Sequence, residues 1–255
     1  MITRTAFVTG ASSGFGAAIA RRLAERGMKL ILLARRSERL QKLASELGVP
    51  AHTIACDIRD NAAVKSALQN LPAEFRDIDI LVNNAGLALG LESADKTDWA
   101  DWLQMIDTNC TALAYLTRLV VVGMVERRRG HIINMGSVAG HYAYPGGNVY
   151  GASKAFVEQF SRGLRADLAG HKIRVTHIAP GLAGGSEFSQ VRFHGDEQKA
   201  QAVYENTQPL MPAAIGKIRH LAAGPPGLLE RLVRNPQRAA RLAFQQRGAA
   251  GPDKA

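Results

Sequence analysis

The chain has 255 residues, of which 46% are hydrophobic and 21% charged, and its mean hydropathy is −0.09. This is the composition of a globular protein with a sizeable core, and it excludes collagen-like, low-complexity and disulfide-scaffold proteins. The charge is unusual, because 32 lysines and arginines against 22 acids give +10 and an isoelectric point near 10.0. Such an excess raises the question of a polyanionic partner, either a nucleic acid or an anionic membrane.

The excess charge is concentrated at the end of the chain. Residues 212–255 carry eight basic and two acidic residues, a net charge of +6, whereas residues 1–211 carry 24 basic and 20 acidic residues, a net charge of +4. The body of the chain is therefore only mildly basic, and the last segment raises the isoelectric point.

Cysteine usage and hydropathy predict the compartment. Cys56 and Cys110 form no CxxC motif, so we expect neither a disulfide framework nor a metal site. The first residues do not read as a secretion signal, and the longest apolar run, Leu119–Val125, is too short to cross a bilayer. We therefore expect a cytoplasmic protein.

Short apolar runs alternate with helical patterns along the first two hundred residues. The expected strands are residues 5–8, 30–33, 52–56, 80–82, 131–135 and 174–178. The expected helices follow the first strand to about residue 26 and then lie near 37–47, 61–71, 98–127 and 150–168. Apolar strands that are each followed by a helix predict an α/β fold, a Rossmann-type doubly wound parallel sheet with helices on both faces, in a single domain. Right-handed crossovers place the loops after the strands along one edge, where ligands bind.

A glycine-rich turn, Thr9–Gly16, separates the first expected strand from the first helix. The residues expected to contact a coenzyme there are Gly10, Ala11, Ser12, Ser13, Gly14, Phe15 and Gly16. Glycines let the backbone approach a pyrophosphate closely, and the helix N-terminus offers free N–H groups and partial positive charge. A purely structural turn could have the same spacing, but the strand-turn-helix context favours a nucleotide site.

The end of the second strand predicts which dinucleotide binds. NAD-binding folds place an acid about 20 residues beyond the glycines, where it holds the ribose 2′-hydroxyl. Here the stretch Leu33–Arg36 contains no acid and ends in Arg35 and Arg36, two guanidinium groups that suit a 2′-phosphate. The alternative is a pair of solvated arginines at the start of a surface helix. We favour NADP(H) as the cofactor.

Tyr150 and Lys154 lie four residues apart in the last expected helix, so the ammonium can approach the phenol. A free tyrosine has a pKa of about 10, and ionisation near pH 7 needs about 4 kcal/mol, which a close cation can supply. An apolar series predicts the buried face of this helix: Ala152, Phe156, Phe160, Leu164 and Leu168. A Tyr-x-x-x-Lys pair is commonly just two surface residues, so the surrounding motifs decide.

Together the motifs resemble the short-chain dehydrogenase/reductase family over about residues 2–211. Thr9–Gly16 matches the family's TGxxxGxG, Asn83–Gly86 its NNAG, and Pro180-Gly181 its PG after the sixth strand. The family's catalytic tetrad falls on Asn109, Ser137, Tyr150 and Lys154. All these elements occur in the family's order and at its spacing.

The resemblance implies a role for each matched residue. Tyr150 would be the general acid in carbonyl reduction and the base in alcohol oxidation, and Ser137 would hydrogen-bond the substrate oxygen. Lys154 would lower the pKa of Tyr150 and hold the nicotinamide ribose, while Asn109 would anchor a water that relays protons to Lys154. Asp57 would meet the adenine amino group. The further coenzyme contacts implied are Ile58, Asn83, Asn84, Ala85, Gly86, Tyr150, Lys154, Pro180 and Gly181, with Asn83 and Asn84 chiefly bracing the sheet edge.

Within that family, three segments resemble the bacterial NADP-dependent 3-hydroxy acid dehydrogenases, also described as serine dehydrogenases: Leu81–Gly90, Gly146–Lys154 and Pro180–Phe193. The resemblance implies oxidation of serine, allo-threonine and 3-hydroxy acids, and reduction of malonic semialdehyde. The main alternative is a 3-ketoacyl reductase, whose threonine-rich loop after PG is not found here. A carboxylate substrate needs a cation, and Arg192 is the candidate by its chemistry. A solvated loop arginine is an equally good interpretation.

The resemblance ends near Met211, and residues 212–255 form a divergent basic tail with no β-rich run. Three interpretations remain: a solvated surface extension, a basic appendage for nucleic acid or membrane, and translation in a shifted frame. We favour the last, because a GC-rich gene read out of frame yields Ala, Arg, Gly and Pro. If no other frame of the coding DNA encodes a family-like acidic helix and strand, this hypothesis fails.

Two function classes follow. An enzyme on a small-molecule substrate, with neither a nucleic-acid nor a membrane partner, is favoured by the intact tetrad. A catalytically silent fold with a basic binding tail predicts salt-sensitive nucleic-acid binding that truncation at Met211 removes. The family implies a homotetramer, which the divergent tail puts in doubt.

Overall fold

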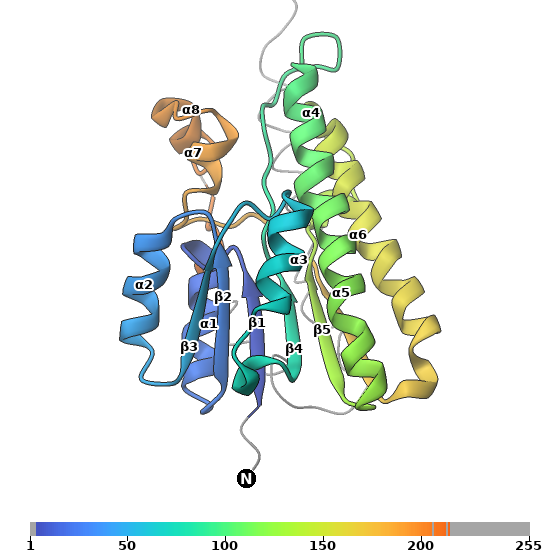
Figure 1. The fold of residues 1–255 in the computed structure, drawn as a ribbon. Helices are drawn as coiled ribbons and strands as arrows, with labels where there is room; N and C mark the ends of the chain where they lie inside the picture. Colours follow the sequence, from blue (N-terminus) through green and yellow to red (C-terminus); the bar gives the residue numbers. More distant parts are fainter. Residues whose placement is uncertain (1–3, 206, 213, 215–255) are drawn as a thin grey trace, which may run out of the picture.

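The fold is that of a computed structural model, which describes residues 4–205, 207–212 and 214 (Figure 1). Six parallel strands form one sheet in the order β3-β2-β1-β4-β5-β6. The strands are β1 (Thr5–Thr9), β2 (Lys29–Ala34), β3 (Ala51–Ala55), β4 (Ile78–Asn83), β5 (Gly130–Met135) and β6 (Ile173–Ile178). The predicted Rossmann-type sheet is confirmed, with each strand within two residues of its expected position.

A helix lies between each strand and the next along the chain, as parallel strands require. The longer ones are α1 (Gly14–Ala24), α2 (Ser37–Glu46), α3 (Asn61–Gln69), α4 (Trp99–Ile106), α5 (Ala112–Glu126) and α6 (Asn148–Asp167). A π-helical turn, η2 (Asp107–Thr111), joins α4 to α5, and two short helices, α7 (Phe188–Arg192) and α8 (Glu197–Ala202), follow β6. Single 3₁₀ turns occur at η1 (Ala73–Phe75), η3 (Val138–Gly140) and η4 (Ala169–His171).

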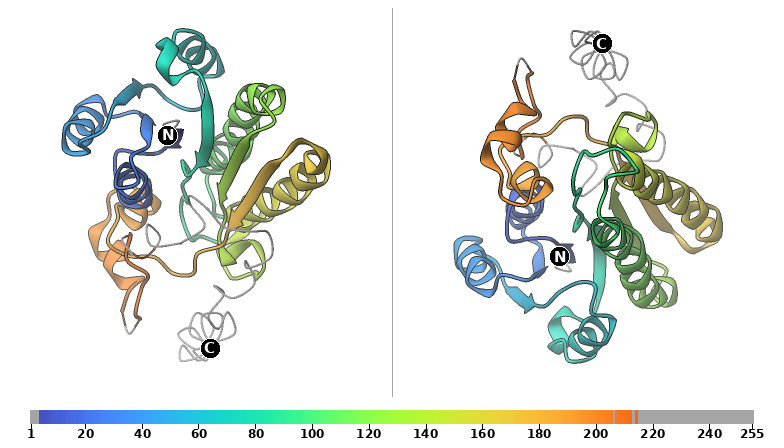
Figure 2. Two further views of the ribbon diagram at one scale, coloured as in Figure 1. Left: turned by 90° about the horizontal axis from the view of Figure 1, so that it is seen from below. Right: turned by 90° about the horizontal axis from the view of Figure 1, so that it is seen from above.

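Two apolar layers hold the helices to the sheet, one on each face. Val8 and Leu32 point to the face covered by α1, where they meet Ile19 in one core cluster. Their strand neighbours point to the other face, in a second cluster with the side chains of α3 and α5. Figure 2 shows helices on both sides of the sheet when it is viewed along the strands. Burial on both faces explains why these strands read as continuous apolar runs.

The prediction of the buried face of α6 is wrong up to Phe160, whereas Leu164 packs against a core cluster and Leu168 is buried in it, as expected. Ala152 is exposed and Phe156 is 41% exposed, and the Phe156 and Phe160 rings stack with centroids 5.7 Å apart. The inward residues of this helix are Tyr150, Ser153, Lys154, Val157 and Ser161. Up to Phe160 the helix turns its polar catalytic motif into the molecule, so hydrophobicity alone identified the wrong stripe there.

Residues 99–126 form a continuous helical segment through α4, η2 and α5. By length and composition it is apolar enough to cross a membrane, with a mean hydropathy of 1.4 over its most apolar stretch. The longest uninterrupted apolar run of the sequence, Leu119–Val125, is too short to reveal this apolar segment, because polar residues interrupt it. Leu116, Val120 and Met124 are nevertheless buried against the sheet, which makes the segment a core helix of this fold.

The carboxyl ends of the strands gather the loops that carry the predicted motifs. The turn after β1, the loop after β4 and the segment after β6 lie together there, with α7 and α8 standing above this edge (Figure 1). Leu210 returns to this segment through an isolated parallel bridge to Ala183. Of the basic tail, residues 212–255, the structure describes residues 212 and 214 alone. The three interpretations of this tail therefore concern residues outside the described ones.

Candidate active site

The glycine turn is held against the loop after β4. Asn84 Nδ2 donates to the Thr9 carbonyl at 2.9 Å, and the Thr9 hydroxyl accepts from the backbone N–H groups of Asn84 and Ala85 at 3.0 and 2.9 Å. Gly10 has a φ of +64°, and a Cβ on Gly16 would lie 2.2 Å from the Gly10 carbonyl oxygen. Both glycines are therefore required by the backbone geometry.

The N-terminus of α1 opens toward the edge where ligands bind. All the predicted residues of this loop lie in the turn or in the first turn of α1: Gly10, Ala11, Ser12, Ser13, Gly14, Phe15 and Gly16. Ser13 occupies the N-cap position, but its side chain accepts no capping hydrogen bond. Backbone N–H groups at such a terminus bind a pyrophosphate well, so the turn fits a dinucleotide.

Arg36 contacts the same turn from the start of α2. Its Nη2 lies 3.1 Å from both the Ser12 and the Ser13 hydroxyl oxygens, and 2.8 Å from a carboxylate oxygen of Glu187. Arg39 Nη1 reaches the other Glu187 oxygen at 2.8 Å. Side-chain hydrogen bonding from Arg36, supported by Arg39, lowers the pKa of Glu187 to about 2. A cluster of two guanidiniums and two hydroxyls fits a 2′-phosphate.

The predicted adenine end lies beyond β3. Asp57 accepts hydrogen bonds from the Arg59 side chain, the closest at 2.7 Å, and from its backbone N–H at 2.9 Å. The Arg59 hydrogen bonds lower the pKa of Asp57, and the exposed Arg35 adds a smaller contribution. Arg35 therefore acts on Asp57, whereas Arg36 contacts the glycine turn. Ile58 is buried in the core.

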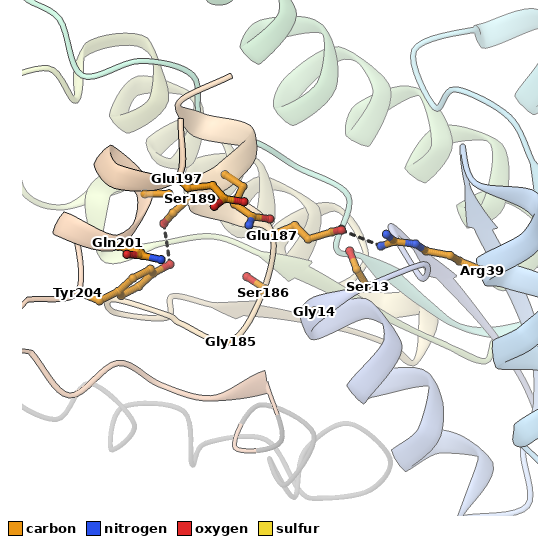
Figure 3. Close-up of a pocket in the computed structure, with 12 residues that line it drawn as sticks. Ser13, Gly14, Arg39, Gly185, Ser186, Glu187, Ser189, Glu197, Gln201 and Tyr204 are labelled. Carbon is orange, nitrogen blue, oxygen red and sulfur yellow. Dashed lines mark hydrogen bonds and ion pairs between the residues drawn. The ribbon is translucent and has the colours of Figure 1, made fainter. Parts of the chain in front are cut away.

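A cavity of about 430 Å³ lies between the glycine turn and the segment after β6 (Figure 3). Ser13 and Gly14 face it from one side, and Ser186 and Glu187 from the other. At its far end the Tyr204 hydroxyl lies 2.6 Å from the Ser189 hydroxyl and donates to the Ala183 carbonyl. Segments after β6 and near residue 204 thus form one wall opposite the glycine turn.

Tyr150 is 8% exposed and has the Ser137 side chain as a hydrogen-bond partner. Burial raises the pKa of Tyr150 to about 12, and the contact with Ser137 opposes the rise only in part. The phenol therefore retains its proton at neutral pH, as a general acid must. Phe188 packs edge-on against the Tyr150 ring, with centroids 6.0 Å apart.

Lys154 is 6% exposed, and its Nζ lies 5.7 Å from the centroid of the Tyr150 ring. The same Nζ donates to the Met135 carbonyl at 3.0 Å. Burial lowers the pKa of Lys154 to about 8. Burial dominates the pKa of both groups, and the Lys154 ammonium bonds the strand carbonyl rather than the phenol. The lowering of the Tyr150 pKa by Lys154 therefore stays a prediction.

Asn109 lies in the π-helical turn η2, and such turns occur frequently at functional sites. Its Oδ1 accepts from the Leu87 N–H at 2.9 Å, and its Nδ2 donates to the Leu87 carbonyl and to the Ser153 hydroxyl. A Cβ on Gly86 would come within 3.1 Å of Asn109 Oδ1 and 3.3 Å of Lys154 Nζ. The NNAG loop and the tetrad are thus in direct contact.

Asn83 and Pro180 support the site from the strand ends. Asn83 is buried, and its Nδ2 donates to Thr117 Oγ1 at 2.9 Å and to Asn134 Oδ1 at 2.8 Å. The Pro180 carbonyl accepts from the Val138 N–H at 3.0 Å, just beyond Ser137, and Gly181 follows in open space. The hydrogen bonds of Asn83 to Thr117 and Asn134 brace the edge of the sheet, as expected for this residue.

Arg192 lies inside the site rather than in solvent, since it is 9% exposed. Its Nε donates to the Gly90 carbonyl at 3.0 Å and its Nη2 to the Tyr144 hydroxyl at 3.2 Å. The guanidinium carbon lies 5.7 Å from the Tyr150 ring centroid. A fixed cation thus stands beside the proposed acid/base.

The family model for short chain dehydrogenases matches residues 4–195. The chain belongs to this family. It is 60% identical over 208 residues to the NADP-dependent 3-hydroxy acid dehydrogenase YdfG of Salmonella typhi, covering 82% of this chain and 84% of the relative. It is 48% identical over 222 residues to serine 3-dehydrogenase of Rhizobium radiobacter, covering 87% and 88%.

The fold is also similar to solved structures. The closed form of a serine dehydrogenase complexed with NADP+ superposes with a TM-score of 0.81 at 56% identity, covering 83% of this chain and 86% of that one. The predicted family and its nearest subgroup are thereby confirmed.

Three further residues of the site were missed by the sequence analysis. Tyr144 holds Arg192, Glu187 holds Arg36, and Arg39 shares that carboxylate. Glu187 lies within a segment used for the resemblance, and Arg39 lies one helical turn beyond Arg35, so charge spacing could have suggested both. No sequence signal identifies Tyr144, because its role depends on where Arg192 folds back.

Proposed function

We propose that this short-chain dehydrogenase is an NADP-dependent oxidoreductase that interconverts a small 3-hydroxy acid and its 3-oxo acid or semialdehyde. The substrates proposed are serine, allo-threonine and 3-hydroxypropionate. The observation that carries the proposal is the buried guanidinium of Arg192 beside Tyr150. A carboxylate two carbons from the reacting carbon needs such a cation, and charge-assisted hydrogen bonds would fix its orientation.

The residues divide the reaction between them. NADP(H), when bound, supplies or accepts the hydride at the carbinol carbon. In reduction Tyr150 gives its phenolic proton to the carbonyl oxygen, which Ser137 also hydrogen-bonds, and in oxidation the phenolate takes the hydroxyl proton. Lys154 stabilises the phenolate, and its ammonium is bound within the fold next to Asn109 and Gly86.

The walls of the site suit a small substrate. Leu87, Leu89 and Met105 form an apolar cluster with Tyr150, and Phe188 packs against it. These side chains leave polar recognition to Ser137 and Arg192. A 3-ketoacyl thioester is the alternative substrate, and it carries no free carboxylate for Arg192 to bind.

Coenzyme oxidation and reduction test the proposal directly. We expect NADPH oxidation with malonic semialdehyde and NADP+ reduction with serine, allo-threonine and 3-hydroxypropionate, and Tyr150→Phe should lower kcat by about 10²- to 10⁴-fold. A 3-ketoacyl thioester serves as the competing substrate. Faster turnover of the thioester would replace the 3-hydroxy acid proposal, and binding of NADPH without turnover of any substrate would favour an impaired family member with a basic binding tail.

We propose self-association through the outer face of α4 and α6, with the homotetramer as the expected form. These two helices contact each other, and Leu103, Ile106 and Phe156 are apolar and exposed on them. Apolar patches of this kind mark interfaces. Light scattering after gel filtration should give an oligomer, which Phe156→Glu dissociates and Gln159→Glu does not. A monomeric native chain would contradict this.

We also propose that the enzyme works in the cytoplasm without a nucleic-acid or membrane partner. Both cysteines, Cys56 and Cys110, are free thiols, as a reducing compartment favours. Fractionation of cells that express the chain would locate it, and recovery with membranes or nucleic acid at physiological salt would contradict the proposal.

A further inference from the structure

The ion pairs of Glu187 join two parts of the site that are far apart in sequence. Glu187 immediately precedes α7, whereas Arg36 and Arg39 lie at the start of α2. One carboxylate oxygen lies 2.8 Å from Arg36 Nη2 and the other 2.8 Å from Arg39 Nη1. The segment after β6 is therefore tied at this point to the predicted 2′-phosphate site (Figure 3).

Arg36 Nη2 already has more acceptors within reach than it has hydrogens. It has two hydrogens, yet it lies within hydrogen-bond distance of the Ser12 and Ser13 hydroxyls and of Glu187. A phosphate placed on the same nitrogen would also stand beside the Glu187 carboxylate, which is ionised at neutral pH because its pKa is about 2. Two anions cannot share this position without repulsion.

We propose that Glu187 is an internal competitor of the coenzyme's 2′-phosphate, and that binding of the phosphate releases Glu187 from Arg36. Glu187 is then a positioning residue that acts through Arg36 and Arg39. The inference rests on the proposed use of NADP(H), and it adds a coupling between the 2′-phosphate site and the proposed carboxylate site. Because α7 begins after Glu187 and ends at Arg192, release at one end of this single short helix reaches the proposed carboxylate site at the other end.

The competing ion pair is weak enough to be displaced. The side chains of Arg36 and Glu187 are 42% and 35% exposed, so solvent screens their attraction. A phosphate dianion offers more charge and more acceptor oxygens than a carboxylate. Removing the competitor should therefore strengthen 2′-phosphate binding by about three- to tenfold, the range of one or two exposed ion pairs.

Calorimetry with coenzyme fragments tests the competition without any turnover. The probes are adenosine 2′,5′-bisphosphate and adenosine 5′-monophosphate, which differ only in the 2′-phosphate. We expect Glu187→Gln to bind the bisphosphate about three- to tenfold more tightly and the monophosphate unchanged. Glu197→Gln, at another acid on the wall of the same cavity, is the matched control and should change neither. A merely structural role for Glu187 would predict weaker binding instead.

The tighter binding of the bisphosphate by Glu187→Gln must also depend on Arg36. In an Arg36→Gln background, Glu187→Gln should no longer tighten bisphosphate binding. Equal or weaker binding of the bisphosphate by Glu187→Gln, an equal gain for the monophosphate, or a gain that persists without Arg36 would overturn the proposal. Absence of bisphosphate binding by the native chain would instead refute the NADP(H) site on which it rests.

Hydrogen exchange provides a second measurement, whose deciding arm uses the native chain. Bisphosphate binding to the native chain should raise the exchange rate of backbone amides in residues 188–193, because the tie at the start of α7 is released. In Glu187→Gln these amides should exchange fast from the outset and respond little. Unchanged or slower exchange in the native chain on bisphosphate binding would contradict the release.

Discussion

The guanidinium carbon of Arg192 lies 5.7 Å from the centroid of the Tyr150 ring, although the two residues are 42 positions apart. The same guanidinium is held by the Gly90 carbonyl and the Tyr144 hydroxyl. The loops that carry Gly90 and Tyr144 therefore fix this cation of α7 beside the acid/base. This relationship explains how a small acid could be oriented with its hydroxyl toward Tyr150.

Replacing Arg192 by glutamine should weaken the use of carboxylate substrates. Loss of a charge-assisted hydrogen bond costs about 1.5–3 kcal/mol, which corresponds to about a 10- to 100-fold lower kcat/KM for serine or 3-hydroxypropionate. Steady-state kinetics on an uncharged alcohol, such as a simple secondary alcohol, provides the comparison. An equal loss on both substrates would mean that Arg192 supports the fold rather than the carboxylate.

Tyr144→Phe removes only the hydroxyl that accepts from Arg192. We expect KM for 3-hydroxy acids to rise about two- to tenfold, since one hydrogen bond of about 1 kcal/mol no longer orients the guanidinium, while kcat changes little. The same measurement on Tyr142→Phe, whose ring is exposed nearby, is the control. A large fall in kcat with unchanged KM would assign Tyr144 to the chemistry instead.

Arg36→Gln should shift the coenzyme preference toward NAD. Affinity for NADPH is expected to fall about 10- to 100-fold through the loss of a guanidinium–phosphate contact, while affinity for NADH stays the same. Fluorescence titration with the two reduced coenzymes measures both affinities. Arg21→Gln, which breaks a surface ion pair with Glu46 far from the turn, should leave them unchanged. Parallel losses for the two coenzymes would place Arg36 outside the 2′-phosphate site.

The fold and the tetrad could be predicted because local patterns specify them. Strands buried on both faces read as apolar runs, and Tyr150 and Lys154 are neighbours on one helix whatever the rest of the chain does. Glu187 and Arg39 are different, since they meet across 148 positions through loops whose course no local pattern specifies. The contact of Tyr144 with Arg192 has the same origin.

The buried face of α6 up to Phe160 was predicted wrongly for a related reason. Amphipathic patterns assume that polar side chains face water, but here Ser153, Lys154 and Ser161 are buried and hydrogen-bonded. Phe156 is left outside. A functional site reverses the usual pattern along the helix that carries it, so the error itself points to the site.

The buried Lys154 ammonium should leave a signature in the pH dependence of stability. Its pKa is about 8 in the folded chain and 10.5 as a reference, so between these values the unfolded chain binds more protons than the folded one. Stability therefore rises with pH in this window, and the destabilisation by Lys154, about 3 kcal/mol at pH 7, fades as pH approaches 10.5.

Lys154→Met removes this titration. Relative to the variant, the native chain should gain about 3 kcal/mol of unfolding free energy between pH 7 and 10.5, whatever constant offset the lost contact with Met135 adds. Urea unfolding at several pH values measures the difference. Lys65→Met, at an exposed lysine of α3, provides the matched comparison and should show no such slope. A constant difference between native chain and Lys154→Met across the window would show that Lys154 titrates normally, and that burial does not set its charge.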